Sequence, residues 1–359
     1  MKIDIVGQRL RNQKLTGPGI KKPADIVSWL GAMQAQEFAV AKWALGLRSP
    51  GLTEADVDRA FDDGTIVRTH ILRPTWHFVA PEDIRWMQKL TGPRVQRQSA
   101  SYHRNVGLDQ RAFARSRRVL ESSLRDGRHL TRAALGAALT RARVPVDGLR
   151  LAFLMMQAEL DLVICSGPRQ GKQFTYALLD ERVPDAKRLD GEEALGELVR
   201  RYFQSHGPAT VHDFVWWSGL TVAQTKAGLA ALGREVESRE LNGVTYWSMP
   251  SARRSASPIG PIVHLLPIYD EYLNALRDRS LARDPSGPTL TVADFVGFPN
   301  QLLVDGILRG AWKREAASRQ TRILVKPFRP LNRKEVRALK DAGAAYSAFL
   351  GQATELSVV

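Results

Sequence analysis

Hydrophobic and polar positions follow helical spacing through much of the first 250 residues, in an order that repeats weakly three times. Each stretch predicts a helix, a short helix, a second helix and a two-stranded ribbon, which is the order of a winged helix-turn-helix. In the third stretch, apolar residues from 195 to 202 predict a helix that stops at 206–208. Thr210 and Thr221 are suited to cap the next two helices, and Asn242-Gly243 predicts a hairpin.

The second stretch has the same order. Its pattern predicts helices at 112–125 and 149–160 and then a wing with the sequence LVICSGPRQGKQFTYALL. The tip of that wing, 166–172, carries Arg169 and Lys172 between two apolar runs. Such a tip is suited to reaching a phosphate, and a solvated hairpin tip accounts for the same pattern.

The first stretch is a looser version of this order. Residues 24–47 predict one long helix, Thr53 is suited to cap a helix at 54–62, and IVRTHILRPTWHFVAP predicts strand, turn and strand. Beyond Pro250 the helical periodicity fades into strand-like runs, which are followed by a closing helix at 334–350.

These patterns together predict an α+β fold that is mainly α, with three tandem winged helix-turn-helix units and a C-terminal small β-barrel-like domain. The expected units are 1–108, an elaborated winged helix, 109–188, 189–252, and the β-rich 253–359. Asp305-Gly306, between apolar runs, predicts a tight turn in the last of these.

A chain of 359 residues with 44% hydrophobic content is larger than one core usually grows, which agrees with several units. Its single cysteine, Cys165, cannot form an internal disulfide, as is typical of a reducing cytosol. No apolar run reaches the roughly 18 residues that a membrane-spanning helix needs, and the N-terminus lacks a signal-peptide pattern. We therefore expect a soluble, cytoplasmic protein.

The formal net charge of +15 favours a polyanionic partner. Arginines outnumber lysines by 39 to 13, and the planar guanidinium suits phosphates and base edges. A GC-rich genome would also favour arginine without any functional reason. Because the positive charge is spread along the chain, double-stranded DNA is a better candidate partner than a membrane surface.

Common catalytic signatures are absent from the sequence, which has no HExxH, paired CxxC, GxSxG or GxxxxGK[ST] motif. The seven histidines show no metal-ligand spacing, so we expect no metal. Gln34 and Gln36 stand out, because they lie within an apolar and aromatic segment. By residue type alone, they either bind a water or substrate, or one caps backbone groups while the other is solvated.

Gln34-Ala35-Gln36 resembles a motif of the AlkZ/YcaQ family of winged-helix DNA glycosylases, in which glutamine, any residue, and glutamine or aspartate follow one another near the N-terminus. ILRPTWHFVAPEDIRWM, LLPIYDEYLNALRDR and LLVDGILRGAWKR are similar to further segments of that family, so the resemblance extends over most of the chain. One departure is Pro74, where relatives often have glycine and where the proline ring stiffens the turn.

The resemblance implies a monofunctional DNA glycosylase without a cofactor, which hydrolyses the N-glycosidic bond of N7-alkylated purines and in some members unhooks interstrand crosslinks. It assigns the catalytic role to Gln34 and Gln36. A glutamine amide is neither acid nor base but can hold a water, which suffices for a leaving group that is already cationic. Residues two apart point about 200° apart around a regular helix, so the helix must end or distort near Gln36.

Further candidate residues lie on the wings and in the C-terminal part. The candidate DNA-binding residues are Arg73, Thr75, His77, Arg169 and Lys172. His77 lies between Trp76 and Phe78, and a buried histidine bonded to the backbone is the alternative. Asp270 and Arg279 are candidate supporting residues, which could form an ion pair that fixes the barrel on the third winged helix.

Two functions are therefore open at the level of sequence. A glycosylase, expected to act as a monomer on double-stranded DNA that carries alkylated purines, would bind with little sequence preference and release damaged bases. A non-enzymatic winged-helix transcriptional regulator would bind a preferred sequence and release none. A bulky crosslink cannot simply be extruded, which favours a shallow, open site.

Overall fold

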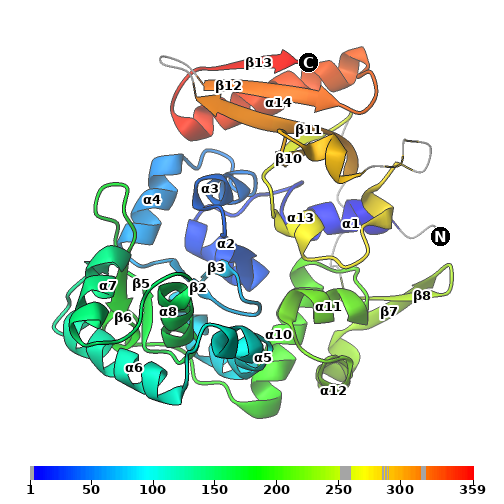
Figure 1. Ribbon diagram of the computed structural model, residues 1–359. Coiled ribbons are helices and arrows are strands. Elements are labelled where there is room, and N and C mark those ends of the chain that lie inside the picture. Colours follow the sequence, from blue (N-terminus) through cyan, green and yellow to red (C-terminus); the bar gives the residue numbers. More distant parts are fainter. Residues whose placement is uncertain (1–3, 251–259, 285–286, 288, 290, 317–320) are drawn as a thin grey trace.

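The computed structural model describes residues 4–250, 260–284, 287, 289, 291–316 and 321–359. Helices and short sheets form the larger part of the molecule, and a sheet backed by the long helix α14 forms the opposite end (Figure 1). The predicted mixture of helices and strands is therefore confirmed. Within the described residues, no helix combines the length and the apolar character needed to cross a membrane.

The N-terminal part contains a three-stranded sheet surrounded by helices. Its elements are α1 (Ile5–Asn12), α2 (Pro23–Leu30), β1 (Ala32–Gln34), α3 (Phe38–Gly46), α4 (Glu54–Asp62), β2 (Val67–His70), β3 (Trp76–Val79), η1 (Pro81–Asp83) and α5 (Ile84–Asn105). The predicted hairpin is confirmed, with Val67 opposite Val79. Thr53 caps α4 through a capping box with Asp56, as the sequence predicts.

The next two stretches contain the helices and hairpins that their patterns predict. The second comprises α6 (Gln110–Leu124), β4 (Leu130–Thr131), α7 (Arg132–Arg141), α8 (Arg150–Leu160), β5 (Ile164–Ser166), β6 (Thr175–Leu178) and α9 (Leu179–Arg182). The third comprises α10 (Gly191–Ser205), α11 (Val211–Ser218), α12 (Val222–Leu232), η2 (Gly233–Glu235), β7 (Glu237–Leu241) and β8 (Val244–Ser248). Thr210 and Thr221 both form capping boxes. Three tandem winged helices stay an interpretation of this order.

The C-terminal sheet has the strand order β13-β12-β11-β10-β9. Its part of the chain comprises β9 (Val263–Leu266), α13 (Glu271–Asn274), η3 (Ser280–Ala282), η4 (Val292–Phe295), β10 (Asn300–Val304), β11 (Ile307–Ala316), β12 (Thr321–Pro327), α14 (Arg333–Leu350) and β13 (Thr354–Val358). The predicted turn at Asp305-Gly306 is confirmed, because Val304 pairs with Ile307 across it. With β9 and β13 at its two edges the sheet curls as a half-barrel, so the predicted barrel is not closed.

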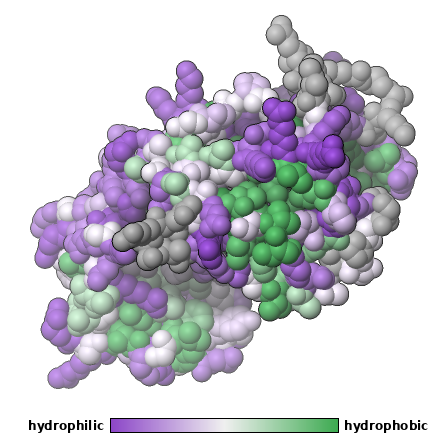
Figure 2. Space-filling model, turned by 90° about the horizontal axis from the view of Figure 1, so that it is seen from above, coloured by the Kyte–Doolittle hydropathy of each residue, from purple (hydrophilic) through white to green (hydrophobic). Residues whose placement is uncertain are grey.

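The strand β13 follows the closing helix, pairs parallel to β12, and was not predicted from sequence. Figure 2 looks onto the end of the molecule that carries this sheet and α14, and shows hydrophobic side chains gathered between hydrophilic ones on that face. The exposed Val358 and Val359 belong to the C-terminal strand and its end.

Buried side chains join the predicted units to one another. Trp43 of α3 donates a hydrogen bond to the carbonyl of Leu265 in β9 at 2.7 Å. Its ring also packs against Tyr346 and Phe349 of α14. One buried cluster therefore spans α2, α3, β3, the C-terminal sheet and α14, and another joins the first hairpin and α5 to α10 and α11. Because Ala32 of β1 and Ala275, directly after α13, belong to the same buried cluster, this packing holds β1 close to α13.

Candidate active site

The two candidate glutamines lie on a strand and the loop after it, so the predicted helix over 24–47 is wrong. The helix α2 ends at Leu30, where Gly31 adopts a φ of +80°, a conformation that glycine adopts without steric cost. The chain then extends as β1 and pairs with β3, with Gln34 opposite His77. The helix was expected to end or distort near Gln36, and it ends earlier, at Leu30, so that both glutamines lie outside it.

An extended chain brings residues two apart to the same side, which a helix does not. Met33 and Ala35 are buried, whereas Gln34 and Gln36 are half-buried. Both amides contact the turn between β2 and β3. Oε1 of Gln34 accepts from Nη2 of Arg73 at 3.1 Å, and Oε1 of Gln36 accepts from the backbone N–H of Trp76 at 3.3 Å.

Three hydrogen bonds hold Gln34, two at its Oε1 and one at its backbone N–H. Besides the bond from Arg73, its Oε1 accepts a bond from Nδ2 of Asn274 at 2.6 Å, and its backbone N–H donates to Oε1 of Glu271 at 2.8 Å. Because two donors converge on Oε1, the orientation of the amide is defined, and Nε2 is the group that is left to donate.

Glu271 is a buried carboxylate behind Gln34. It also accepts a bond from the indole of Trp217 at 3.1 Å, and Nε2 of His206 lies 3.5 Å from its Oε2. Burial on its own would raise the pKa of Glu271, but the interaction with His206 and the hydrogen bond from the N–H of Gln34 hold it below its ordinary value. The site therefore contains a negative charge in a region shielded from water.

A cavity of about 530 Å³ opens beside Gln34. Its wall comprises Gln34, Arg73, Pro74, Thr75, Arg94, Gln98, His212, Val215, Trp216, Gly219, Asn274 and Arg277. Three of these side chains are arginines and none is acidic. Trp216 is 44% exposed, and its indole N–H donates to the carbonyl of Asn274 at 2.9 Å. This cavity suits an anionic polymer together with a flat ring that can stack on the indole.

A family model described as DNA glycosylase AlkZ-like matches residues 27–349, which is most of the chain. The chain belongs to this family. An interstrand DNA cross-link repair glycosylase from Streptomyces sahachiroi is 23% identical over 353 residues, which cover 95% of this chain and 94% of the relative. The structure of the DNA glycosylase AlkZ from the same organism matches over the full length of both chains with a TM-score of 0.79 at 20% identity, which shows a shared fold.

The family resemblance inferred from the motif and segments is thus confirmed, and the protein is a DNA glycosylase. The alternative of a non-enzymatic regulator loses its support.

In this AlkZ-like glycosylase His77 is fully buried, and its Nδ1 lies 2.8 Å from the carbonyl of Thr75. The arrangement matches the alternative of a buried, backbone-bonded histidine, and a DNA contact would require the side chain to be uncovered. Burial, followed by the charge of Arg73, lowers the pKa of His77 to about 3. The ring is therefore neutral at physiological pH.

We predict that His77 makes the folded state sensitive to mild acid. A histidine whose pKa is lowered on folding contributes stability that is complete above its unfolded pKa of about 6.5 and is lost progressively as pH falls below it. Between pH 6.5 and 5, wild type should lose about 2 kcal/mol more than His77→Asn, whose amide can still donate to the Thr75 carbonyl. Urea unfolding at pH 7, 6 and 5 measures this, and equal losses in both proteins would contradict it.

The two candidate DNA-binding residues on the second wing differ in how freely their side chains could contact DNA. Arg169 donates to Asp62 at 3.0 Å and lies 3.1 Å from Asp58 of α4, so its guanidinium already has two carboxylate partners. Those bonds raise the pKa of Arg169, although burial opposes the shift. Lys172 is exposed at the tip of the wing.

The hypothesised ion pair between Asp270 and Arg279 is wrong. Asp270 instead binds Arg48 through two hydrogen bonds of 2.8 and 2.9 Å, and both side chains are buried. Asp270 also caps α13 by accepting from the N–H of Tyr272. Arg279 contacts the carbonyl of Leu276 at 3.4 Å and lines a different cavity.

Sequence reasoning did not single out Glu271, Asn274 or Trp216. The first two lie in the segment LLPIYDEYLNALRDR, which resembles the family, but they are 237 and 240 residues from Gln34. Pairing over such a distance leaves no local pattern. The described residues contain no group of three or more histidine, cysteine, aspartate or glutamate side chains that could hold a metal ion.

Proposed function

We propose that this AlkZ-like glycosylase hydrolyses the N-glycosidic bond of N7-alkylated purines in double-stranded DNA, including bulky adducts and interstrand crosslinks. Gln34 and Gln36 position the attacking water. The observation that carries the proposal is the amide of Gln34, which is fixed by Arg73 and Asn274 at the wall of a basic cavity. The relative from Streptomyces sahachiroi, which is named for interstrand crosslink repair, supports the class of lesion.

The two amides offer complementary bonds to a water. Nε2 of Gln34 donates to the water oxygen, because Oε1 of the same amide is already occupied by two donors. Oε1 of Gln36 accepts one bond, from the N–H of Trp76, and keeps a second lone pair for a water proton. Together they orient the water without removing a proton from it.

The turn next to these amides has unmet hydrogen-bonding capacity. Nε of Arg73, Oγ1 of Thr75 and Nε2 of His77 are buried and have no hydrogen-bond partner within the described part of the chain. Buried polar atoms of this kind cost about 1–3 kcal/mol each when they stay unpaired. Their concentration at one turn supports a hydrated site beside Gln34.

The leaving group explains why amides suffice. Alkylation at N7 gives the purine a positive charge, so the electron pair of the breaking C1′–N9 bond moves to the base and neutralises it. Water then bonds to C1′ of the developing oxocarbenium sugar and releases its proton to solvent. No general acid is required, and an unmodified, neutral guanine is a poor substrate because nothing in this step protonates it.

Charges around the site fit this step. The buried carboxylate of Glu271, behind Gln34, favours positive charge that develops on the sugar, since its field acts in a region of low dielectric. Arg73, Arg94 and Arg277 at the cavity wall bind the DNA backbone, whose phosphates neutralise them.

Among the proposed DNA-binding residues, Arg73, Thr75 and Lys172 are the most accessible, because the first two line the cavity and the third is exposed. Arg169 must exchange its bonds to Asp58 and Asp62 for a phosphate, and His77 must be uncovered. The proposed enzyme acts as a monomer and uses no cofactor.

The test is base release from duplexes of one sequence that carry either N7-methylguanine or only normal bases. We expect free N7-methylguanine and an equal amount of abasic sites above the enzyme-free background, with no product from the normal duplex. DNA binding should weaken steeply as salt increases and depend little on sequence. Tight binding without release from the methylated duplex would overturn the proposal.

A further inference from the structure

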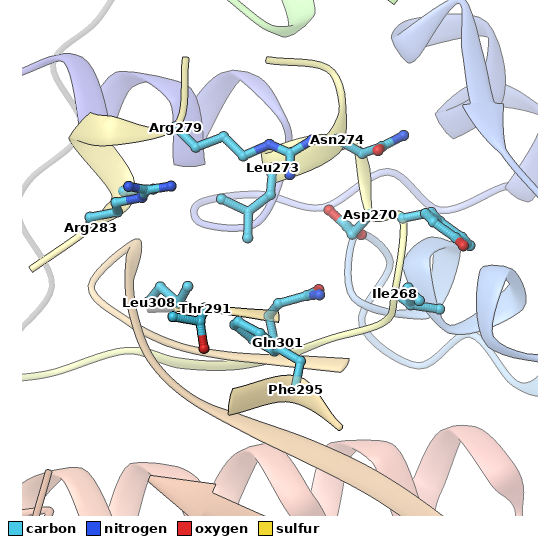
Figure 3. Close-up of a pocket in the computed structure, with 12 residues that line it drawn as sticks. Ile268, Asp270, Leu273, Asn274, Arg279, Arg283, Thr291, Phe295, Gln301 and Leu308 are labelled. Atoms are coloured by element: carbon cyan, nitrogen blue, oxygen red, sulfur yellow. The ribbon is translucent and has the colours of Figure 1, made fainter. Parts of the chain in front are cut away.

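A second cavity, of about 610 Å³, also borders α13, through Asp270, Leu273 and Asn274. Figure 3 shows its open centre, with Leu273 and Arg279 above it and Gln301, Phe295 and Leu308 below. Its walls come from the segment around α13 and η3, from η4, and from the strands β10 and β11. A cavity of this size matches the range of about 300–1,000 Å³ that drug-sized ligands occupy.

The lining of this second cavity combines apolar side chains with two arginines. Leu273, Leu308 and Phe295 supply apolar surface, and the guanidinium groups of Arg279 and Arg283 reach into the same space (Figure 3). The pKa of Arg279 is lowered by burial and further by the charge of Arg283. These two cations thus repel each other, which disfavours a cationic occupant and favours one with acceptor oxygens.

The acid in this wall does not neutralise the two arginines. Asp270 has its carboxylate bound to Arg48 on the buried side, through both oxygens. Arg279 makes a weak contact of 3.4 Å with the carbonyl of Leu276. The N–H groups of the Arg279 guanidinium can therefore donate hydrogen bonds to acceptor oxygens of a ligand, whether neutral or negatively charged.

Asn274 connects the two cavities. It lines both of them, and its side chain donates to Oε1 of Gln34 at 2.6 Å. The side chain that holds the proposed catalytic amide is therefore also part of the wall of the second cavity. In duplex DNA, a substituent on N7 of guanine projects from the major-groove edge of the base, away from the glycosidic bond.

We infer that the second cavity binds the bulky substituent of an N7-alkylated purine, specifically an apolar group that carries carbonyl or hydroxyl oxygens. This inference rests on the proposed function. The apolar wall binds the body of the substituent, and Arg279 and Arg283 bind its oxygens. The base and sugar meanwhile face the first cavity, where Gln34 positions the water.

Two variants test this pocket. Gln301→Trp places a large ring in the second cavity from the half-buried surface of β10. Arg279→Ala removes a hydrogen-bond donor from the wall and gives up only the weak contact with the carbonyl of Leu276 among the described residues. Single-turnover base release is measured on two duplexes of the same sequence. One carries N7-methylguanine, and the other carries guanine whose N7 bears a polycyclic substituent with carbonyl oxygens.

For the polycyclic adduct, we expect the enzyme concentration that gives half-maximal rate to rise about tenfold or more in Gln301→Trp and severalfold in Arg279→Ala. Release of N7-methylguanine reports in the same preparations whether the fold and the first cavity are intact, and it should stay close to wild type. If this enzyme concentration for the polycyclic adduct were unchanged in both variants, the inference about the second cavity would be wrong, and the proposed function would still stand. Absence of release from both substrates by wild type would instead overturn the proposed function.

Discussion

Gln34→Ala should lower the single-turnover rate of N7-methylguanine release by about 10²–10³-fold, the loss typical when one preorganised hydrogen-bond donor is removed from an active site. Alanine deletes Nε2, the donor proposed for the attacking water, and leaves Arg73 and Asn274 without the acceptor that they share. Gln36→Ala should also lower the rate, because it removes the proposed acceptor. The measurement uses saturating enzyme, so that the rate reports the bound complex.

Gln98→Ala is the matched control for this prediction. Gln98 lines the same cavity but is exposed, and it takes no part in the hydrogen bonds that hold Gln34. Its replacement should leave the rate within about twofold of wild type, because an exposed side chain that holds no catalytic group in place usually contributes little. If Gln98→Ala and Gln34→Ala were equally active, with equal DNA binding, the role assigned to Gln34 would be wrong.

Asp270→Asn should destabilise the protein by about 3–5 kcal/mol, because it leaves the Arg48 guanidinium charged and buried without its carboxylate. Both side chains of this pair are at most 1% exposed. Asparagine can still cap α13, so the substitution isolates the charge. The effect is functional as well, since α13 carries Glu271 and Asn274, two of the three residues whose hydrogen bonds hold Gln34. Urea unfolding measures the loss.

Lys89→Ala provides the comparison, because Lys89 pairs with Asp190 at 3.3 Å and both side chains are more than half exposed. That change should cost no more than about 1 kcal/mol, as exposed pairs do. Replacing Arg48 and Asp270 together by methionine and leucine should recover much of the stability, since no buried charge is then left unpaired. A loss of less than about 1 kcal/mol in Asp270→Asn would show that the pair does not anchor α13.

Local patterns predicted the elements whose causes are local. The capping boxes at Thr53, Thr210 and Thr221 join residues three apart, and the turn at Asn242-Gly243 depends on two residues with positive φ. The predicted helix at 24–47 failed because its apolar spacing is compatible with two short helices, and because β1 is extended by pairing with β3, more than forty residues away in sequence. Tertiary pairing here overrides helix propensity.

The candidate site was predicted only in part, because sequence patterns reveal contacts between neighbouring residues and not those between distant ones. Its motif is short and local, so Gln34 and Gln36 could be identified, whereas Glu271 and Asn274 reach Gln34 only through the packing of α13 against the N-terminal part. Asp270 was assigned the wrong partner because Arg48 lies within an apolar segment and at a separation of 222 residues. Opposite charges near one another in sequence do not identify which pair becomes buried.

Unhooking of a crosslinked duplex tests the central claim most directly. The substrate is a duplex whose strands are joined through N7 of two guanines, and the products are separated on a denaturing gel and assayed for abasic sites. Wild type should convert the crosslinked species to single strands, with one abasic site for each bond that is hydrolysed, and Gln34→Ala should bind the same duplex equally well without converting it. Equal conversion by both proteins, or binding by wild type without any conversion, would contradict the account.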